Sequence, residues 1–409
     1  MAQLLIVADD LTGAADTGAC FAARGLATVI PLTRGADIDA DVVVLSTESR
    51  DLSGEDAARV VAEAVAGQLA AQEETGPRWV YKKIDSALRG NPRDELLAVM
   101  AASGERRALV APAFPAQGRT TIGGRQFVDG LPLAESSMGG ERSTSDIAAV
   151  FAGGDVPTRV LGLAAIHDQP EEVAAILEAE AAGIIIADAA TEDDLLALAR
   201  AVRRTSLRLL CGTAGFARAL VHALPLRPAS LPDPRRRPSA HPVLVVAGSQ
   251  NEATRRQIDR LADAGVPIVR PSQDAIDGSG SIDDVAREVR ASLVRGRSTV
   301  LTTAGLAPSP LCGKAVAERL ARIVASPLLH DALGGLVLTG GDVAAAVCAA
   351  LAGVALWLGG EISPGQPWGI LETRDGTRIP TATKAGSFGD ERALLAAMDY
   401  LAAPSGPRQ

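Results

Sequence analysis

The chain has 409 residues, and 47% of them are hydrophobic, which is enough apolar material for one large or two ordinary domains. The formal net charge is −9, so the protein lacks the overall positive field that attracts nucleic acid. Four scattered cysteines form no C-x-x-C pair, and the first ten residues carry two acids and no basic region, so neither disulfides nor a secretory signal are expected. We therefore expect a cytoplasmic protein with neither nucleic-acid nor membrane partners.

The first half of the chain repeats one pattern: a short apolar run, a turn of small or polar residues, and an Ala/Leu-rich stretch with helical spacing. The apolar runs are "LLIVA" (4–8), "DVVVLS" (41–46), "WVYKKID" (79–85), "GIIIADA" (183–189) and "LRLLCG" (207–212). Thr191 and Asp194 form a capping-box pattern at the start of one predicted helix. Alternating short strands and helices predict a parallel sheet that is covered by helices on both faces.

A proline-rich segment divides the chain. Six prolines in the eighteen residues from Pro225 to Pro242 predict a linker, because proline at this density sustains neither a helix nor an inner strand. The strand–helix pattern restarts after it, in segments such as "PVLVVAGSQN" and "GGLVLTGGDVAAAVCAALAG". We predict two α/β domains, at 1–235 and 242–409, each a mostly parallel sheet flanked by helices, with an active-site cleft between them.

One stretch, Val343 to Leu358, is apolar enough to suggest a membrane segment. It follows Asp342 directly, contains Gly353, and is shorter than the ~20 residues that a membrane span needs. We therefore expect a buried helix followed by a strand.

Two adjacent acids, Asp9 and Asp10, follow the first apolar run, at the strand end where open parallel sheets bind ligands. Adjacent side chains on a strand point to opposite faces, so we expect one Asp to face the ligand and the other to cap the next helix or brace the turn. Leu11 stands where a haloacid-dehalogenase-type phosphatase needs its second Asp, which excludes that class. An Asp facing the ligand could hydrogen-bond a hydroxyl or act as a general base. Helix-start roles for both acids are the alternative.

Basic residues follow the next two predicted strands. Arg50 comes after the second strand, and "YKKIDSALRG" after the third adds Lys82, Lys83, Asp85 and Arg89. Arg is suited to bidentate carboxylate capture and Lys supplies a mobile point charge, so these strand ends could hold an acid that carries hydroxyl groups. Ordinary surface salt bridges are the alternative. The following segment 111–133, "APAFPAQGRTTIGGRQFVDGLPL", predicts a strand end and then a loop or hairpin, either a rim of the site or a plain excursion.

Three turns of the second domain, in "LVVAGSQN", "VLTGGDVA" and "ATKAGSFGDE", place Gly between a predicted strand and helix. Such turns expose backbone N–H groups that bind phosphate. None matches a P-loop or the G-x-G-x-x-G pattern of dinucleotide-binding proteins. Asp342 could either help to hold magnesium or cap its helix, and we expect Asp390 to be a cap. The four histidines lie in no motif, so hydrolase and zinc sites are not predicted.

Taken together, "ADDLTGAADTG", "KKIDSALRGN", "PAFPAQGRTTIGG", "GSQN", "TGGD" and "KAGSFG" resemble the four-carbon acid sugar kinases, in the family's order and from Leu4 to about Leu401. This resemblance implies an N-terminal sugar-acid-binding domain and a C-terminal ATP-binding domain. It also implies phosphoryl transfer from ATP, with Mg²⁺, to the terminal hydroxyl of a tetronate. The "ADDLTGAADTG" wording favours the threonate or erythronate type over the 3-oxo-tetronate type.

The resemblance also implies site residues. The expected substrate contacts are Asp10, Arg50, Lys82, Lys83, Ile84 and Asp85, to which the strand-end cluster adds Asp9 and Arg89, and the expected nucleotide contacts are Ser249, Thr339, Gly340, Gly341, Asp342 and Gly386. Asp10 is the predicted catalytic base. The chain departs from the family at Ala87, where Thr is more common, and at Gln126, where His is common, so the exact substrate stays open.

Several alternatives remain at this point. A 3-oxo-tetronate 4-kinase would use the same site, whereas a ribokinase-type small-molecule kinase would use Asp390 as its base. A sugar-acid sensor would keep the predicted cleft but would not turn over. The expected partners are a small sugar acid and ATP, and a homodimer is considered, although the sequence sets neither the oligomeric state nor a metal-binding set.

Overall fold

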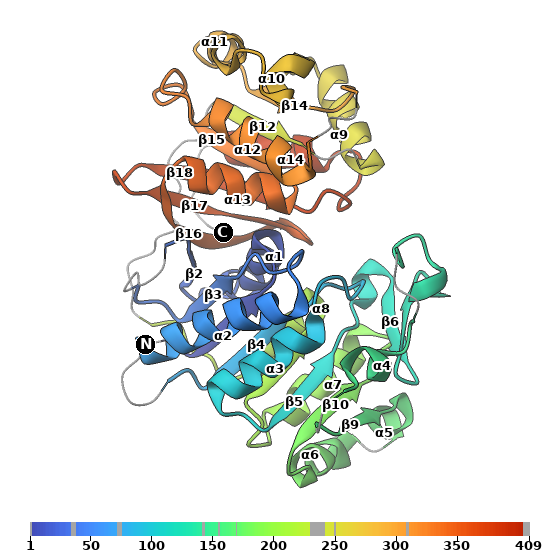
Figure 1. The fold of residues 1–409 in the computed structure, drawn as a ribbon. Coiled ribbons are helices and arrows are strands. Elements are labelled where there is room, and N and C mark those ends of the chain that lie inside the picture. Colours follow the sequence, from blue (N-terminus) through green and yellow to red (C-terminus); the bar gives the residue numbers. More distant parts are fainter. Residues whose placement is uncertain are drawn as a thin grey trace. The chain divides into compact units, whose positions relative to one another are not determined.

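The computed structural model describes residues 2–33, 38–71, 76–140, 144–153, 156–168, 170–229, 242–248, 251–307 and 311–403 (Figure 1). They form two compact units, one within residues 1–26 and 37–230 and one within residues 27–36 and 231–409. The division differs from the predicted boundaries at residues 27–36, which contribute a strand to the second unit. Most of the predicted linker, residues 230–241, lies outside the described residues.

Unit 1 contains a seven-stranded sheet in which every strand pair is parallel. Its order is β3 (Val42–Ser46), β1 (Leu4–Ala8), β4 (Trp79–Lys83), β11 (Leu209–Gly212), β5 (Arg107–Ala111), β10 (Gly183–Ala187) and β9 (Thr158–Leu161). All five residues of β1 are buried, as are all five of β4. Continuous burial is typical of parallel strands that are covered on both faces, which confirms the predicted α/β class.

The helices of unit 1 cover this sheet (Figure 1). They are α1 (Leu11–Ala22), α2 (Gly54–Ala70), α3 (Pro92–Ser103), α4 (Ile147–Phe151), α5 (Leu163–Asp168), α6 (Pro170–Ala179), α7 (Glu192–Val202) and α8 (Ala214–Ala223). Helices α2 and α3 pack against each other on one face, and α8 packs against both α1 and α7 on the other. The predicted capping box starts α7: Thr191 Oγ1 accepts from Asp194 N, and the Asp194 carboxylate accepts from Thr191 N.

The predicted excursion is a small antiparallel sheet made of β6 (Arg119–Ile122), β7 (Arg125–Val128) and β8 (Leu131–Pro132), flanked by the 3₁₀ turns Pro115–Gln117 and Leu133–Glu135. The β6–β7 turn consists of Gly123 and Gly124, both at positive φ, and the Asp188 carboxylate accepts from both of their N–H groups. Fully buried Gln126 donates to the carbonyl of Ser86, which follows β4. The excursion is therefore tied to the loop that follows β4.

Unit 2 contains a mixed sheet of eight strands. Its order is β13 (Ile268–Val269), β14 (Thr299–Thr302), β12 (Val243–Ala247), β15 (Gly335–Thr339), β18 (Arg378–Lys384), β17 (Gln366–Thr373), β16 (Gly353–Ser363) and β2 (Thr28–Pro31). The pairs from β13 to β18 are parallel, whereas those from β18 to β2 are antiparallel. The repeated strand–helix pattern predicted the parallel part, but β2 joins this sheet from an earlier part of the chain.

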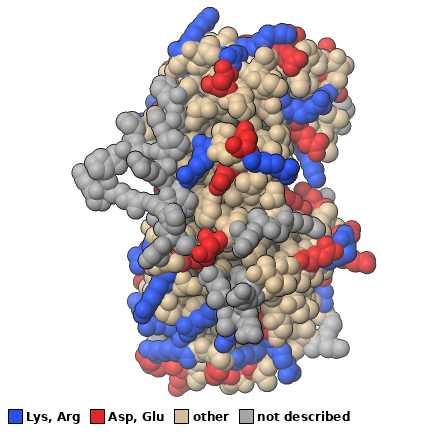
Figure 2. Space-filling model, turned by 90° about the vertical axis from the view of Figure 1, so that its left-hand side faces the viewer, with Lys and Arg blue, Asp and Glu red and all other residues tan. Residues whose placement is uncertain are grey.

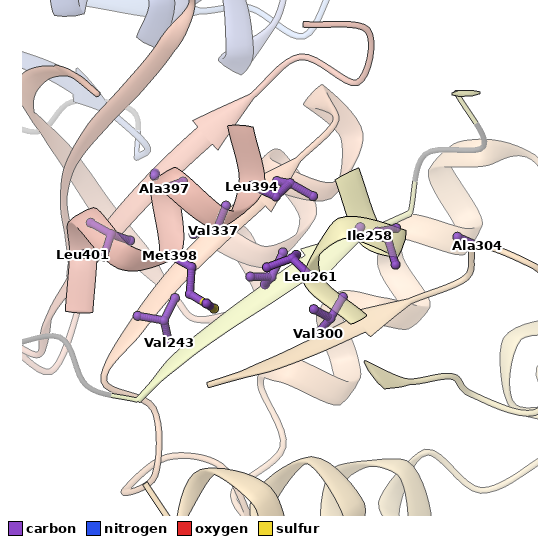
Figure 3. Packing of buried hydrophobic residues seen from close by; sticks show 13 residues of the cluster. Val243, Ile258, Leu261, Val300, Ala304, Val337, Leu394, Ala397, Met398 and Leu401 are labelled. Carbon is purple, nitrogen blue, oxygen red and sulfur yellow. The ribbon is translucent and has the colours of Figure 1, made fainter. Parts of the chain in front are cut away.

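The helices of unit 2 are α9 (Glu252–Asp263), α10 (Gln273–Asp277), α11 (Ile282–Leu293), α12 (Gly313–Val324), α13 (Gly341–Ala350) and α14 (Ala393–Ala402). The apolar stretch from Val343 to Leu358 thus divides between α13 and β16, as predicted. No helix in the described part of the chain is long and apolar enough to cross a membrane. Helices α9 and α14 contribute Ile258, Leu261, Leu394 and Met398 to a buried cluster over β12, β14 and β15 (Figure 3).

Basic and acidic side chains are interspersed on the face shown in Figure 2. The described residues include exposed ion pairs, such as Arg59 with Asp56 and Arg287 with Asp284. Exposed pairs of this kind contribute little to stability, because both charges are well solvated when apart. The apolar cores therefore carry most of the stability of each unit.

Two valines of unit 2 test whether the buried core, rather than the surface, carries most of the stability. Val300 lies in the buried cluster at 0% exposure, whereas Val294, at the end of α11, is 59% exposed. We expect Val300→Ala to lower the free energy of unfolding by about 2 kcal/mol, from lost apolar burial plus the cavity left behind. Val294→Ala should change it by less than about 0.5 kcal/mol, as surface substitutions usually do. Urea denaturation of both variants measures the difference, and equal effects would place the core of unit 2 elsewhere.

Candidate active site

The carboxyl ends of β1, β3 and β4 form the ligand-binding edge of unit 1. The chain passes from β1 to β3 on one side of it and then to β4 on the other side, so β1 marks the switch point of the sheet. Open α/β sheets bind ligands at such a point, outside the carboxyl ends of the strands. The predicted residues Asp9, Asp10, Arg50 and Asp85 directly follow these three strands.

Arg50 holds both adjacent acids. Its Nε and Nη2 donate to the two carboxylate oxygens of Asp9 at 2.8 and 2.9 Å, and its Nη1 donates to Asp10 Oδ2 at 2.6 Å. Burial would raise the pKa of Asp9, but the charge and hydrogen bonds of Arg50 bring it below its ordinary value. Two neighbouring carboxylates in one partly buried place would otherwise repel each other, so Arg50 is what allows both to stay ionised.

The cap at the start of α1 is Asp10, not Asp9. Asp10 Oδ1 accepts from Gly13 N at 2.8 Å, which is the N-cap bond of the helix. Asp10 is also the more exposed of the two, at 14% of its side chain against 3% for Asp9. The helix cap therefore falls on Asp10, whereas Asp9 braces the turn through Arg50, and which acid faces the ligand stays a prediction. Burial raises the pKa of Asp10 above its ordinary value, with Arg50 opposing the rise.

Lys82 lies behind the cluster. Its ammonium pairs with Glu95 of α3 at 2.8 Å and donates to the Lys83 carbonyl at 2.7 Å, and the Lys82 and Glu95 side chains are 0% and 2% exposed. Ser49 donates to the other oxygen of Glu95 at 2.6 Å. The predicted substrate contact at Lys82 therefore gives way to an internal ion pair that connects β4, α3 and the end of β3. The sequence analysis missed Glu95, because an acid on a helix resembles any surface residue.

The loop after β4 is organised by Asp85. Its carboxylate accepts from Ala87 N and from both Nε and Nη2 of Arg89, at 2.9, 3.0 and 2.7 Å. Burial would raise the pKa of Asp85, but the hydrogen bonds and charge of Arg89 hold it well below its ordinary value. Ile84 is buried and donates its N–H to Gly212 of the neighbouring strand. Arg89 is thus committed to Asp85, and Ile84 anchors the loop.

Lys83 differs from these cations. It is 6% exposed, and it forms no ion pair or side-chain hydrogen bond with the described residues. A Cβ built on Gly13 would lie 2.6 Å from Asp10 Oδ1 and 2.9 Å from Lys83 Nζ. The start of α1 therefore brings the Asp10 carboxylate and the Lys83 ammonium close together, and a side chain at residue 13 would have to displace one of them. The charge of Lys83 also lowers the pKa values of Asp9, Asp10 and Asp85, although it forms no direct ion pair with them.

Backbone strain occurs at the same edge. Glu48 and Leu88, which follow β3 and β4, have φ of 48° and 56°, a left-handed conformation that non-glycine residues rarely adopt. Such strain concentrates at ligand sites, where the surrounding structure holds it in place. Desolvation by the surrounding protein, together with the charges of Asp10 and Asp9, raises the pKa of Glu48 to about 7, although part of its side chain is accessible to solvent. Glu48 is a further titrating carboxylate that the sequence analysis missed.

In unit 2, two of the predicted glycine turns lie side by side at the carboxyl ends of β15 and β18. Thr339 is opposite Lys384 in the sheet, and Gly340 N donates to the Lys384 carbonyl at 2.9 Å. Helix α13 starts at Gly341 with no side-chain cap, and the N–H groups of Gly341 and Asp342 have no acceptor within hydrogen-bond distance among the described residues. The buried Oγ1 of Thr339 also lacks a partner there. These free donors fit the phosphate chain of a nucleotide.

The second turn, residues 385–390, is fixed by helix α9. Thr254 Oγ1 donates to the Gly386 carbonyl at 2.8 Å, and Gln257 Nε2 donates to the carbonyls of Phe388, Gly389 and Asp390. The carbonyl groups of the turn therefore face α9. This leaves the N–H groups of Gly386 and Ser387 without a protein acceptor among the described residues.

The other predicted site residues, Ser249 and Asp390, do not belong to the clusters described above. Ser249 is outside the described residues. Asp390 is exposed and accepts from Arg392 N at 2.9 Å in the turn before α14, whose N-cap residue is Arg392, so the expected helix cap at Asp390 is wrong. In the described ranges, no three His, Cys, Asp or Glu side chains come together as a metal site.

A cavity of about 760 Å³, lined by residues such as Leu333 and Ile379, lies at the amino ends of β15 and β18, the edge opposite the glycine turns.

The two units thus present different groups at their strand ends: charged side chains in unit 1, which suit a small polar ligand, and free N–H groups in the described turns of unit 2, which suit phosphate. A family model described as a sugar-binding N-terminal domain matches residues 4–220, and one described as a nucleotide-binding C-terminal domain matches residues 244–394. The chain belongs to the four-carbon acid sugar kinase family.

Individual relatives align over nearly the whole chain. A D-threonate kinase from Salmonella typhimurium is 35% identical and covers 98% of both chains, and a D-erythronate kinase from Heliobacterium modesticaldum is 31% identical and covers 98% of this chain and 97% of its own. A solved structure from Salmonella typhimurium, described as a putative tRNA synthase, has a TM-score of 0.80 at 22% identity and covers 97% of this chain and 99% of its own. The structural match shows that the fold is shared.

The Asp85–Arg89 pair predicts a pH-dependent stability. We expect Asp85→Asn to destabilise the protein at pH 7, because Arg89 loses its anion and the loop loses an ionised acceptor. The folded-state pKa of Asp85 lies below its ordinary value of 3.8. The stabilisation by the Asp85 carboxylate is therefore fully present above pH 3.8 and is lost as the pH falls from 3.8 through the folded-state pKa. The difference in melting temperature between parent and Asp85→Asn should therefore stay nearly constant from pH 7 down to the ordinary pKa of 3.8 and shrink as the pH is lowered further.

Asp56→Asn is the matched control, because Asp56 also pairs with an arginine but is exposed. It should change the melting temperature little at any pH. A difference for Asp85→Asn that stays constant as the pH falls below 3.8 would contradict the charged role of Asp85.

Proposed function

We propose that this protein is an ATP-dependent kinase that phosphorylates the terminal hydroxyl of a four-carbon sugar acid in the cytoplasm, with D-threonate as the favoured substrate. The observation that carries the proposal is the strand-end cluster of unit 1, in which one buried cation, Lys83, forms no direct ion pair with the described acids and lies near Asp10. An acid with hydroxyl groups complements this pair. The 35% identity to a D-threonate kinase, against 31% to a D-erythronate kinase, supports the choice of threonate.

Lys83 is the residue that we assign to the substrate carboxylate. Arg50, which the sequence also offered for this role, already uses Nε, Nη1 and Nη2 on Asp9 and Asp10. Arg89 is committed to Asp85, and Lys82 to Glu95. The Lys83 ammonium interacts electrostatically with Asp9, Asp10 and Asp85 but forms no direct ion pair with the described acids, so it can still bond to a substrate carboxylate.

Asp10 is the residue that we assign to the attacking hydroxyl. The hydroxyl oxygen forms a bond to the γ-phosphorus of ATP, the bond to the β–γ bridging oxygen breaks, and ADP leaves. The hydroxyl proton passes to Asp10, whose raised pKa brings it nearer to the working pH of a general base. Asp9 and Arg50 orient Asp10, while the strained Glu48 stands at the edge of the same site. The alternative base is Asp390, although its carboxylate already caps a turn.

For the nucleotide, we assign Thr339, Gly340, Gly341, Asp342 and Gly386 to the phosphates, and Ser249 by resemblance alone. The free N–H groups at the start of α13 and the unpartnered Oγ1 of Thr339 support this assignment. Magnesium is commonly held by one or two carboxylates together with substrate phosphates, and Asp342 is the acid nearest in sequence to these donors. Bound there, Mg²⁺ would neutralise phosphate charge.

The general-base assignment can be tested with two matched variants. Asp10→Asn preserves the size and the cap acceptor but removes the basicity, so kcat should fall by about 10²–10⁴-fold with little change in ATP affinity. Asp9→Asn removes half of the Arg50 clamp and should reduce kcat less, through misplacement of Asp10. Steady-state kinetics on both variants decides between them. Full activity of Asp10→Asn would move the base to Glu48 or Asp390.

The carboxylate assignment predicts an effect on substrate affinity. Lys83→Met should raise KM for the sugar acid by about tenfold or more, because it removes the charge that the carboxylate meets, and it should leave KM for ATP unchanged. The parent should also discriminate against neutral tetritols, which leave Lys83 unpaired. A Lys83→Met variant that still prefers the acid over the tetritol as strongly as the parent does would refute this role.

The function itself is tested by coupled ADP release on a panel of D- and L-threonate, D- and L-erythronate and their 3-oxo forms. We expect ATP-dependent turnover with D-threonate as the most efficient substrate. Higher efficiency with a 3-oxo acid would reassign the substrate within the family. Binding of the acids without ADP release would favour the sensor, and turnover only with other small alcohols would favour a ribokinase-type enzyme.

A further inference from the structure

Lys384, the last residue of β18, is the most unusual charge in unit 2. It is 1% exposed, and its ammonium donates to the carbonyls of Ala385, Gly386 and Phe388 at 2.8, 3.2 and 3.0 Å. It forms no ion pair with any acid in the described part of the chain. A buried, positively charged group with no anion is costly to keep, so its presence requires an explanation beyond packing.

The turn does not need Lys384 to satisfy its carbonyl groups. The Ala385 carbonyl also accepts from Phe388 N at 3.1 Å, the Gly386 carbonyl accepts from Thr254, and the Phe388 carbonyl accepts from Gln257. Each of the three acceptors thus has a second donor. Replacing the ammonium with an apolar group would leave none of them unpaired, so the bonds alone do not account for the charge.

The composition of the chain also indicates a specific role for Lys384. Only four of its 40 Lys and Arg residues are lysines, and three of these four, Lys82, Lys83 and Lys384, stand at the carboxyl ends of β4 and β18. A compact ammonium with three donors suits an enclosure of several carbonyl groups within one tight turn, because it needs less space than a planar guanidinium. Elsewhere the chain uses arginine for its positive charge, so lysine is confined largely to the two ligand-binding edges.

We propose that Lys384 is a positioning residue for the nucleotide phosphates, an inference that rests on the proposed kinase function. By gathering three carbonyl groups around itself, the ammonium holds the turn so that the N–H groups of Gly386 and Ser387 point away from it. Its own charge lies directly behind those N–H groups, and a phosphate bound in front of them supplies the anion that the folded protein otherwise lacks. Lys384 acts through the turn and does not touch the nucleotide.

The test compares Lys384→Met with the parent, using calorimetric titrations of adenosine, ADP and ATP and the melting temperature of each protein. Methionine matches the aliphatic part of lysine without its charge. We expect ATP affinity to fall by about tenfold, ADP affinity to fall less, and adenosine affinity to stay unchanged, because the lost attraction scales with phosphate charge. The affinity for the sugar acid should be unchanged, and the melting temperature should not fall. Arg378→Met, which removes a charge from the exposed first residue of the same strand, is the matched control and should leave all affinities unchanged.

Three results would overturn the inference. One is unchanged ATP affinity in Lys384→Met. Another is an equal loss of adenosine and ATP affinity, which would indicate a damaged base or ribose site. The third is a lower melting temperature with a parallel loss of sugar-acid affinity, which would make Lys384 purely structural. A parent protein that binds no ATP would instead overturn the proposed function, and this inference with it.

Discussion

The guanidinium of Arg50 is the interaction on which the site of unit 1 depends. Two consecutive carboxylates at the end of a buried strand repel each other, and Arg50 offsets that repulsion by bonding to both. Because Asp10 also caps α1, the same contact fixes the start of that helix and the separation between Asp10 and Lys83. With Arg50 fully occupied, Lys83 is left as the cation that can receive an acid. The electrostatics of the strand ends thus determine which ligand chemistry the edge can accept.

The two units offer different kinds of ligand-binding groups at their strand ends. Our proposal assigns the sugar acid to charged side chains on loops after β1, β3 and β4 of unit 1. It assigns the phosphates to backbone N–H groups in turns after β15 and β18 of unit 2, the second of which is bonded by Lys384. Side-chain charges suit a small acid whose carboxylate and hydroxyls must be told apart. Backbone N–H groups suit phosphates, which carry many equivalent oxygens. This difference supports separate roles for the two sheets in a kinase, while the cleft predicted between them stays a prediction.

Much of the fold and of the unit 1 cluster could be predicted from the sequence, because strand ends are easy to locate. Apolar runs such as Leu4–Ala8 fixed the strands, and the residues after them gave the cluster around Asp9 and Arg50. What the sequence did not reveal was pairing across the fold. It could not show that Glu95 neutralises Lys82, that Asp10 rather than Asp9 caps α1, or that β2 joins the second sheet, because each depends on partners that are distant in sequence or on local backbone direction.

Hydrogen exchange of the backbone, measured with each ligand added separately, tests the division of roles most directly. ADP should slow exchange in residues 339–343 and 385–389 and leave residues 9–13 and 83–90 unchanged. D-Threonate should do the reverse, slowing exchange after β1, β3 and β4 only. Protection of the unit 1 strand ends by ADP alone, or of the unit 2 glycine turns by D-threonate alone, would contradict the assignment of the sugar acid to one sheet and the nucleotide to the other.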